Sequence, residues 1–457
     1  METVPTVDVD LDWVEELTRR ETEALDRKHA RSLSYREEAK RYLPGGVSSS
    51  WQSWPPHPIY VRRGEGAHVW DIDGNEYVDL HNGYGVMVMG HAHPKIVEAV
   101  QRRVTEGTHF AQPTEDALPV AENLAERYRL PQWRFGNSGT EATLDACRIS
   151  RALTGRSKIL KIEGTYHGHH DSLMVSVFPP REAAGPREHP SSVPQTLGMP
   201  DGIVEQVVIV PFNDAAAMER AFAEHDGEIA GVMIEPAMSN CGLVLPDPGY
   251  LQAVIEVAHR NGALVAFDEV KTGFTVAWGG AVQAFDVVPD LVCLAKSLGA
   301  GLPCGAIGGT EDAMSMIIRG ELDQVGTFNG NPLTMAAAKV NLEEVLVPEA
   351  YKEFDRINGI LGRCEDVIAK HRLPASMKLL GAKGSIDWSP EPIHEYRDLW
   401  SIDDRVPQLA WLWQLNRGVF KSPGSKWESW TTSIVHTDED ARRYVDNFEE
   451  LAAALVS

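Results

Sequence analysis

Basic residues are scarce in this chain relative to acidic ones, and cysteines are few. Its 457 residues include 43 Lys and Arg against 66 Asp and Glu, a formal net charge of −23. Nucleic-acid binding needs clustered basic side chains, so this balance argues against it, and an anionic ligand would need a local positive site. The five cysteines are odd in number and lack CxxC spacing, which predicts neither a disulfide framework nor a zinc site.

Long apolar runs are also missing. The first thirty residues are acidic and lack the apolar core of a signal peptide, and no later stretch is long and apolar enough to span a bilayer. We therefore expect a soluble, cytoplasmic protein with no membrane or nucleic-acid partner. The chain is long enough, and at 43% hydrophobic residues apolar enough, to bury a large core and divide into two or three domains.

The middle of the chain has the pattern of an α/β protein. Between about Lys95 and Ala338, short apolar runs alternate with helical stretches, which predicts a mostly parallel sheet covered on both faces. One of these helices, GYLQAVIEVAHRNG, carries a single apolar stripe and ends at Gly262. The run FPPREAAGPREHPSSVPQTLGMPDG is rich in Pro, Gly and Ser, so we expect a long surface loop there, of a kind that often forms a lid.

The two ends of the chain have other patterns. Apolar residues follow helical spacing from Leu11, and a second short helix is expected over 34–42. From 59 to 80, short β segments surround a tight turn at Asp73-Gly74, which predicts a small antiparallel meander.

Near the C-terminus, Thr437 is an expected helix N-cap, with Asp440 at the capping-box position. We predict three parts: residues 1–80 as an N-terminal arm with short helices and a β meander, 81–338 as a large α/β domain, and 339–457 as a small domain.

A candidate phosphate site lies at Ser138-Gly139-Thr140. This segment follows a strand-like run and opens a helix, whose N-terminus presents free N–H groups and a positive dipole end. The two hydroxyl groups add donors, and Gly139 lacks the Cβ that would block close approach of a ligand. The same residues also suit a simple N-cap, so this stretch alone leaves both interpretations open. A nucleotide-binding α/β protein is an alternative hypothesis for the same segment. The absence of a GxGxxG motif after the first strand argues against it.

Two charged residues follow neighbouring apolar runs. Asp268 ends ALVAF and Lys296 follows LVCLA, at the sheet edge where open α/β proteins place ligands. A lysine with a depressed pKa supplies the neutral amine that attacks an aldehyde, and a carboxylate against a pyridine nitrogen keeps that ring protonated. These roles predict pyridoxal 5'-phosphate (PLP) bound to Lys296 as a Schiff base. The alternatives are a structural Asp–Lys ion pair and a competing lysine, Lys271. The glycine-rich segment that follows Lys296 would let a bulky cofactor approach, which favours Lys296 over Lys271.

The segment TYHGHHD allows two interpretations. Its histidines, His167, His169 and His170, lack acidic or cysteine partners at metal spacing, so we expect no metal site. Either Tyr166 or His167 is a better candidate to stack on a pyridine ring. The alternative is that both residues only pack within the loop.

Several segments, in order along the chain, resemble class III aminotransferases. They are PGGV at 44, GHAHP at 90, NSGTEA at 137, GTYHGHHD at 164, IEPAMSN at 234, FDEVKTGF at 267, AKSLGAGLPCGAIGG at 295 and GTFNGNP at 326. The resemblance runs from about Ser34 to the C-terminus. It implies a PLP-dependent aminotransferase of fold type I, with a mostly parallel central sheet in the large domain and a smaller α+β domain formed by the N- and C-terminal segments.

The resemblance also implies roles for matching residues. Ser138, Gly139 and Thr140 would hold the phosphate, Tyr166 would stack on the ring, and Asn240 would reach the phenolic oxygen. In this family the active site lies between two subunits, which implies a homodimer. The implied catalytic residues are Lys296, Asp268 and Tyr166. The implied cofactor-binding set is Ser138, Gly139, Thr140, Tyr166, His167, Glu235, Asn240, Asp268, Val270 and Lys296, with Gly326 and Thr327 from the partner chain.

One position departs from the nearest pattern in the family, that of the glutamate-1-semialdehyde aminomutases. These enzymes carry an arginine after PGGV that binds the substrate carboxylate, where this chain has Gln52. A neutral amide lacks the charged bidentate fork of arginine. We therefore favour transfer of an amino group from an amine, β-amino acid or related donor to a keto acid or aldehyde acceptor. Aminomutase-like isomerisation is the alternative, and Lys421 or Lys426 could replace the missing charge.

The residues around Gln52 are aromatic. We place Trp51, Gln52 and Tyr84 among the substrate-binding residues, and Trp51 with Trp54 would favour an apolar or aromatic substrate arm. The alternative is that these tryptophans pack the N-terminal arm against a second subunit.

Overall fold

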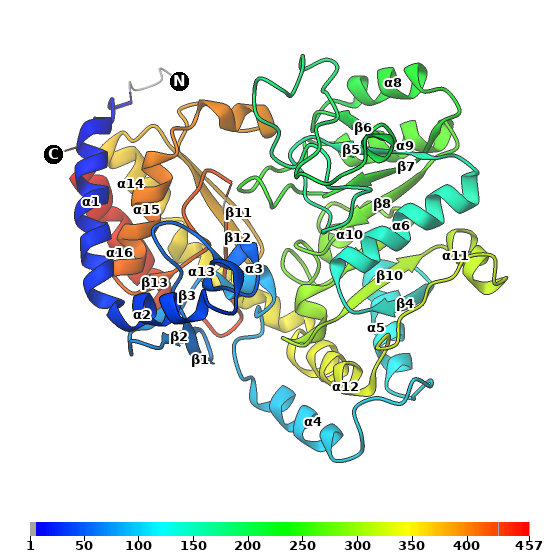
Figure 1. Ribbon diagram of the computed structural model, residues 1–457, viewed down its shortest axis with the longest axis horizontal. Coiled ribbons are helices and arrows are strands. Elements are labelled where there is room, and N and C mark those ends of the chain that lie inside the picture. The colour runs from blue at the N-terminus through cyan, green and yellow to red at the C-terminus, as the bar shows by residue number, and fades with distance from the viewer. Residues whose placement is uncertain (1–5, 428, 457) are drawn as a thin grey trace.

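The computed structural model describes residues 6–427 and 429–456, which form a larger and a smaller unit side by side (Figure 1). The larger unit is built on a seven-stranded sheet of order β4-β10-β9-β8-β7-β5-β6. Only β10 runs antiparallel to its neighbours, and the other pairs are parallel. The expected α/β fold with a mostly parallel central sheet is therefore confirmed. The strands are β4 Gln132–Gly136, β5 Lys158–Ile162, β6 Val207–Val210, β7 Ile229–Ile234, β8 Leu264–Asp268, β9 Leu291–Leu294 and β10 Gly305–Gly309.

Both faces of this sheet are covered by helices, because successive side chains of a strand point to opposite faces. On β8, Val265 and Phe267 belong to one apolar core and Ala266 to another. The first core includes α5 (Ala117–Tyr128), α8 (Ala215–Glu224), α9 (Tyr250–Arg260) and α12 (Pro332–Val340). The second core includes α6 (Gly139–Thr154) and α11 (Glu311–Ile318). Shorter or peripheral helices are α3 Asn82–Gly85, α4 Pro94–Val104, α7 Asp201–Val204 and α10 Gly280–Ala284.

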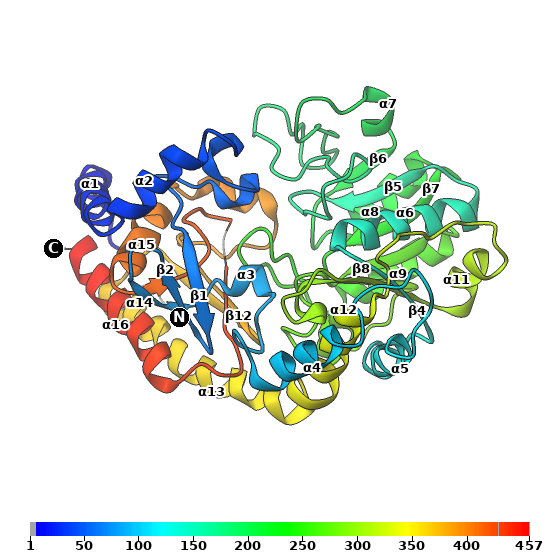
Figure 2. The same ribbon diagram turned by 60° about the horizontal axis from the view of Figure 1, so that its bottom comes forward.

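The smaller unit combines segments from both ends of the chain (Figure 2). It contains a sheet of order β1-β2-β3-β13 and a second sheet of order β11-β12-β14. Its strands are β1 Val61–Glu65, β2 His68–Asp71, β3 Glu76–Asp79, β11 Ser376–Leu380, β12 Lys383–Asp387, β13 Val419–Phe420 and β14 Trp430–Thr431. Its helices are α1 Leu11–Lys28, α2 Ala30–Ala39, α13 Lys352–Leu361, α14 Cys364–His371, α15 Arg405–Asn416 and α16 Asp438–Leu455.

The local predictions for the ends of the chain are largely confirmed. The meander forms as β1 to β3, and Thr437 caps α16 with Asp440 in a capping box. The second helix begins earlier than expected, at Ala30 and not near residue 34. The carboxylate of Asp73 explains the shift, because it accepts hydrogen bonds from the backbone N–H groups of Arg31 and Ser32 at 2.7 and 3.0 Å.

The predicted long loop connects β5 to β6, and apart from α7 it holds neither helix nor strand. Within residues 6–427 and 429–456, no helix is both long and apolar enough to cross a membrane. Residues 1–5 of the acidic N-terminal segment lie outside the described residues. The domain boundaries at residues 80 and 338 stay predictions.

Candidate active site

The cofactor residues predicted within one chain gather around a single cavity of about 390 Å³. It lies at the carboxyl ends of β8 and β9 and the start of α6. The predicted residues that line it are Ser138, Gly139, Thr140, Tyr166, His167, Glu235, Asn240, Asp268, Val270 and Lys296. Segments more than 150 residues apart in the sequence are thus brought to one place, as expected for the edge of an open α/β sheet.

One end of the cavity is formed by the N-terminus of α6. Ser138 is the N-cap, and its Oγ accepts a hydrogen bond from Glu141 N at 3.2 Å. Thr140 Oγ1 accepts from His169 N at 3.0 Å. In both hydroxyl groups the oxygen is used as an acceptor, which leaves the proton available for a ligand. The N-cap interpretation is therefore correct, and it does not exclude anion binding by the same residues.

Gly139 allows another segment to approach this helix closely. A Cβ at this position would lie 2.8 and 2.9 Å from the two methyl carbons of Val270. Any side chain here would push against the turn that follows β8. The absence of a Cβ therefore brings the start of α6 close to the segment that carries Asp268.

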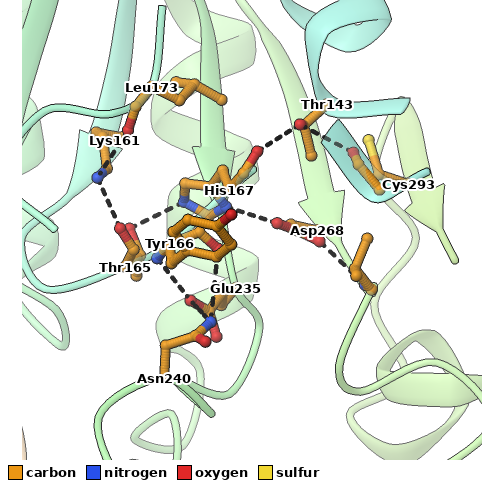
Figure 3. Close-up of polar contacts among 12 residues, drawn as sticks. Thr143, Lys161, Thr165, Tyr166, His167, Leu173, Glu235, Asn240, Asp268 and Cys293 are labelled. Carbon is orange, nitrogen blue, oxygen red and sulfur yellow. Dashed lines mark hydrogen bonds and ion pairs between the residues drawn. The ribbon is translucent and has the colours of Figure 1, made fainter. Parts of the chain in front are cut away.

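At the opposite end, Asp268 is held by two donors (Figure 3). Its Oδ2 lies 2.7 Å from His167 Nδ1, and its Oδ1 accepts from Val270 N at 3.0 Å. Thr165 lies 2.9 Å from His167 Nε2 and donates its own proton to Ile162 O at 2.6 Å. Nε2 therefore donates to Thr165, and the ring is fixed at both nitrogens. His167 is thus held against Asp268, which leaves Tyr166 as the candidate to stack on a ring.

Lys161 stabilises the loop that carries Tyr166 and His167, although no sequence pattern pointed to this residue. Its side chain is fully buried, and Nζ donates to Thr165 O at 2.7 Å and Val175 O at 2.6 Å. Burial lowers the pKa of Lys161 to about 7. The ammonium ties together the two ends of the loop that carries Tyr166 and His167 (Figure 3). The sequence feature that could have indicated this role is the second lysine of the run KILKI, which stands between apolar residues.

Glu235 organises a third side of the cavity. Its Oε1 accepts from Tyr166 N at 3.1 Å and Asn240 Nδ2 at 2.7 Å, and its Oε2 accepts from Ser239 N at 2.9 Å. Both carboxylate oxygens are therefore used to position neighbours. The predicted contact of Asn240 with a phenolic oxygen stays a prediction.

Lys296 lies between these groups. Burial, reinforced by the nearby charge of Lys271, lowers the pKa of Lys296 to about 8. Its backbone is left-handed, with φ of 47°, a strained conformation that is common at functional sites. Asp268 contacts His167 at 2.7 Å, and among the described residues it forms no ion pair with Lys296, so the alternative of a structural Asp268–Lys296 ion pair is not supported. Lys271, the competing lysine, lines the same cavity, and its Nζ donates to Ser239 O at 2.8 Å.

Aromatic side chains stand beside this cavity. The Trp51 ring meets the rings of Tyr166 and Tyr84 edge to face, at centroid distances of 5.6 and 5.9 Å. The Tyr84 hydroxyl and Trp54 Nε1 both donate to Trp51 O, at 3.2 and 2.8 Å. Trp51 is therefore fixed against Tyr166, the residue expected to cover the cofactor ring.

Gln52 does not point its amide oxygen at the Lys296 cavity. Its Oε1 accepts from Ser48 N at 3.1 Å, which closes the turn on which it lies. Trp51, Gln52 and Tyr84 all line a neighbouring cavity of about 540 Å³. Lys426, a suggested replacement for the missing arginine, turns instead to Asp404 and to Ile402 O.

Gly326 and Thr327 lie apart from the Lys296 cavity. They line a separate groove with residues near His109 and Phe135, and Thr327 O accepts from His109 Nε2 at 2.7 Å. Gly326 and Thr327 therefore do not line the Lys296 cavity of their own chain.

Comparisons with known proteins agree on the family. The sequence profile described as aminotransferase class-III matches residues 50–452. A glutamate-1-semialdehyde 2,1-aminomutase from Bacillus subtilis is 37% identical, over 94% of this chain and 99% of that protein. An omega-transaminase from Sphaerobacter thermophilus is 33% identical, with a TM-score of 0.86 over 93% of this chain and 97% of that chain.

A glutamate-1-semialdehyde aminomutase from Pseudomonas aeruginosa is 29% identical, with a TM-score of 0.89 over 98% of this chain and 100% of that chain. A variant of that aminomutase was solved in complex with PMP. The names of the relatives by sequence favour the aminomutase alternative, and the solved structures include both kinds of enzyme.

Proposed function

Because this chain belongs to the class III aminotransferase family, whose members depend on PLP, we propose that it transfers amino groups between two small molecules. The donor is an amine, a β-amino acid or a related compound, and the acceptor is a keto acid or aldehyde. The observation that carries the proposal is that Lys296, the N-terminus of α6 and a carboxylate held by His167 line one cavity.

The residues present fit PLP. The hydroxyl oxygens of Ser138 and Thr140 accept backbone hydrogen bonds and leave their protons for a phosphate, and the start of α6 lines the same cavity. Asp268 lines the same cavity and would accept a hydrogen bond from the protonated ring nitrogen. When bound, PLP supplies an aldehyde that condenses with amines and a protonated ring that withdraws electrons from the substrate carbon.

The chain's own groups then move protons and exclude water. With its pKa lowered to about 8, Lys296 is partly neutral near neutral pH, so its Nζ can attack an aldehyde and later take a proton from the substrate carbon and return it. Asp268 stays fixed because His167 and Val270 N hold its two oxygens. Tyr166, braced by Trp51, covers the side of the cavity that faces the neighbouring aromatic pocket.

Two observations favour transfer between substrates over isomerisation of one substrate. Gln52 replaces the carboxylate-binding arginine of the aminomutase pattern, and its amide oxygen is used by Ser48 N. Trp51 and Tyr84 give the site an aromatic wall, which suits a bulkier donor. Isomerisation of glutamate-1-semialdehyde is the second candidate, and the names of the relatives support it.

The test compares the two reactions in the PLP-loaded protein. Transfer predicts that alanine accumulates from pyruvate in the presence of an amine or amino acid donor, in step with the loss of the donor. Isomerisation predicts conversion of glutamate-1-semialdehyde with no second substrate and no alanine. Lys296→Ala is the control for both, because it removes the attacking amine while the fold is retained. Isomerisation without any transfer to pyruvate would overturn the proposal.

We also propose a homodimer in which Gly326 and Thr327 complete the phosphate site of the other subunit. Exposed apolar side chains beside them support this proposal, since Val325 is 81% and Phe328 58% exposed in the single chain. A cytoplasmic location is proposed as well, because all five cysteines are buried as free thiols.

A further inference from the structure

Two ammonium groups line the candidate active site. Among the described residues that line the cavity, the lysines are Lys271 and Lys296, and no arginine is present. The proposed function commits Lys296 to the cofactor. Lys271 is then the other lysine in the cavity wall, and the proposed function assigns it no role.

The geometry of Lys271 leaves it able to bind an anion. An ammonium has three N–H donors, and one of these goes to Ser239 O at 2.8 Å. Nζ also lies 5.6 Å from the centre of the Tyr84 ring, a cation–π distance that keeps the lysine beside the aromatic wall. The charge of Lys271 reaches the reacting lysine, because it contributes to the lowered pKa of Lys296.

The acids of the cavity are engaged elsewhere. Glu235 uses both oxygens to accept from Tyr166 N, Asn240 Nδ2 and Ser239 N. Asp268 uses its two oxygens for His167 and Val270 N. Lys271 therefore has a hydrogen bond to a neutral carbonyl and an aromatic neighbour, which leaves its charge to be balanced by a ligand.

Two residues outside the cavity that were candidates to contact a carboxylate are engaged elsewhere. Gln52 is neutral and turned toward Ser48 N, and Lys426 is paired with Asp404. A substrate carboxylate that enters next to Lys296 would thus meet Lys271 and not an arginine. Tyr84 lies beside Lys271, and its ring packs against that of Trp51. A carbon arm next to that carboxylate would therefore contact aromatic side chains.

We propose that Lys271 binds the carboxylate of the amino donor, and that the enzyme prefers carboxylated donors with an apolar or aromatic arm over simple amines. The inference rests on the proposed function and specifies its substrate class. The arm has room in the neighbouring cavity of about 540 Å³, which Trp51, Trp54 and Tyr84 line.

The experiment uses matched pairs of donors that differ only in the carboxylate: phenylalanine with 2-phenylethylamine, and 3-amino-3-phenylpropanoate with 1-phenylethylamine. The PLP-loaded wild type, Lys271→Met and Lys426→Met are compared by the rate at which each donor changes the visible spectrum of the bound cofactor. Lys426→Met is the control for loss of a lysine outside the Lys296 cavity. Thermal unfolding shows whether each variant is folded.

In the wild type we expect a higher kcat/KM for the acid of at least one pair than for its amine. Relative to the matched amine, Lys271→Met should lower kcat/KM for the acid about 10- to 100-fold, the loss of one charge-assisted contact, because any change in the pKa of Lys296 affects both donors of a pair alike. Lys426→Met should preserve the preference. A second readout is equilibrium binding of 3-phenylpropanoate, which has no amino group to react, and Lys271→Met should weaken it.

An equal loss for acid and amine would overturn the inference, because Lys271 would then act on the cofactor and not on the carboxylate. Unchanged kinetics and unchanged 3-phenylpropanoate binding would overturn it as well. The proposed function fails by a different result, namely no spectral change of the wild type with any donor. Transfer that proceeds without a carboxylate preference leaves the function intact and removes only the role of Lys271.

Discussion

His167 Nδ1 lies 2.7 Å from Asp268 Oδ2, so the imidazole and the carboxylate that we propose faces the ring nitrogen form one hydrogen-bonded unit. The unit continues through Nε2 to Thr165, whose carbonyl oxygen accepts from the buried ammonium of Lys161. Asp268 is therefore positioned by a chain of contacts that begins on β5, the strand two places away in the sheet. The orientation of this carboxylate thus depends partly on Thr165 and Lys161, which do not line the cavity.

The first prediction concerns His167 as a positioning residue. His167→Phe keeps the ring volume and removes both hydrogen bonds, so Asp268 loses one anchor. We expect kcat to fall about 10- to 100-fold, the usual effect of losing a residue that orients a catalytic group. The visible spectrum of bound PLP should also shift, because the protonation of the ring nitrogen depends on Asp268. The exposed His169 is the matched control, since His169→Ala leaves its backbone contact to Thr140 intact. Wild-type kcat and spectrum in His167→Phe would contradict this role.

The second prediction concerns the pH dependence of cofactor capture by the protein freed of PLP. An ordinary lysine has a pKa near 10.5, and here burial lowers the pKa of Lys296 to about 8. Because the neutral amine is the attacking form, the capture rate should rise with pH and level off above about 8. Stopped-flow absorbance after addition of PLP measures this rate. Lys271→Met should move the inflection to higher pH, because the charge of Lys271 contributes to the lowered value. A rate that still climbs steeply at pH 10 would contradict the prediction.

Local sequence patterns predicted most of the fold and the principal site residues. The apolar runs became strands of the central sheet, and Ser138, Asp268 and Lys296 meet in one cavity because strand ends converge at a single edge. The sequence did not predict features that depend on distant contacts. The pairing of β13 with β3 joins residues more than 300 positions apart, and Asp73 caps a helix that starts 43 residues before it. Local patterns do not encode such pairs.

The sequence also did not predict the direction in which individual side chains point. The structure places Gln52 in the cavity next to that of Lys296, and its bond to Ser48 N follows from the conformation of the turn and not from residue type. The sequence predicts Lys161 only as part of a strand. Its role depends on the carbonyl groups of Thr165 and Val175, which accept hydrogen bonds from Nζ. In the same way, Lys271 was noted only as a competitor of Lys296.

The third prediction tests the close approach at Gly139. In Gly139→Ala the new methyl group would lie 2.8 Å from Val270, so α6 or the turn after β8 has to move. We expect a loss of stability of about 1–3 kcal/mol, typical of overpacking, and a weaker affinity for PLP. Thermal unfolding and equilibrium dialysis measure the two effects. Gly202→Ala is the control, because its added methyl group meets no atom within 4 Å. Equal behaviour of the two variants would show that the approach at Gly139 is not constrained.

The fourth prediction concerns the long loop between β5 and β6. Arg397 makes a bidentate contact with the buried Glu163, at 2.6 and 2.9 Å, and also donates to the carbonyl groups of Ala184 and Gly185. The Tyr396 hydroxyl donates to Pro179 O at 3.0 Å. These contacts fasten the proposed lid to the smaller unit of the fold.

Arg397→Met should therefore leave Glu163 unpaired and detach the loop. Breaking a buried pair on one side costs about 3–5 kcal/mol, so we expect a clear fall in the denaturant midpoint and faster protease cleavage within residues 178–200. The double variant Glu163→Gln with Arg397→Met should recover part of that stability, since no charge is left buried. Loop cleavage should stay fast in both variants. Unchanged proteolysis in Arg397→Met would show that other contacts hold the loop.

The last prediction tests the proposed homodimer through Phe328. This side chain is 58% exposed in the single chain and stands next to Gly326 and Thr327, the residues expected to complete the phosphate site of a second subunit. A carboxylate at this position would be buried without a partner in the dimer, so Phe328→Asp should shift the protein from dimer to monomer in analytical ultracentrifugation. Affinity for PLP should fall together with the dimer, because each phosphate site would lose the residues of the other chain. Leu197, 99% exposed in the long loop, provides the control, and Leu197→Asp should leave mass and affinity unchanged. A monomer that retains full affinity for PLP would separate dimer formation from the cofactor site, and Gly326 and Thr327 would then have no part in binding the phosphate.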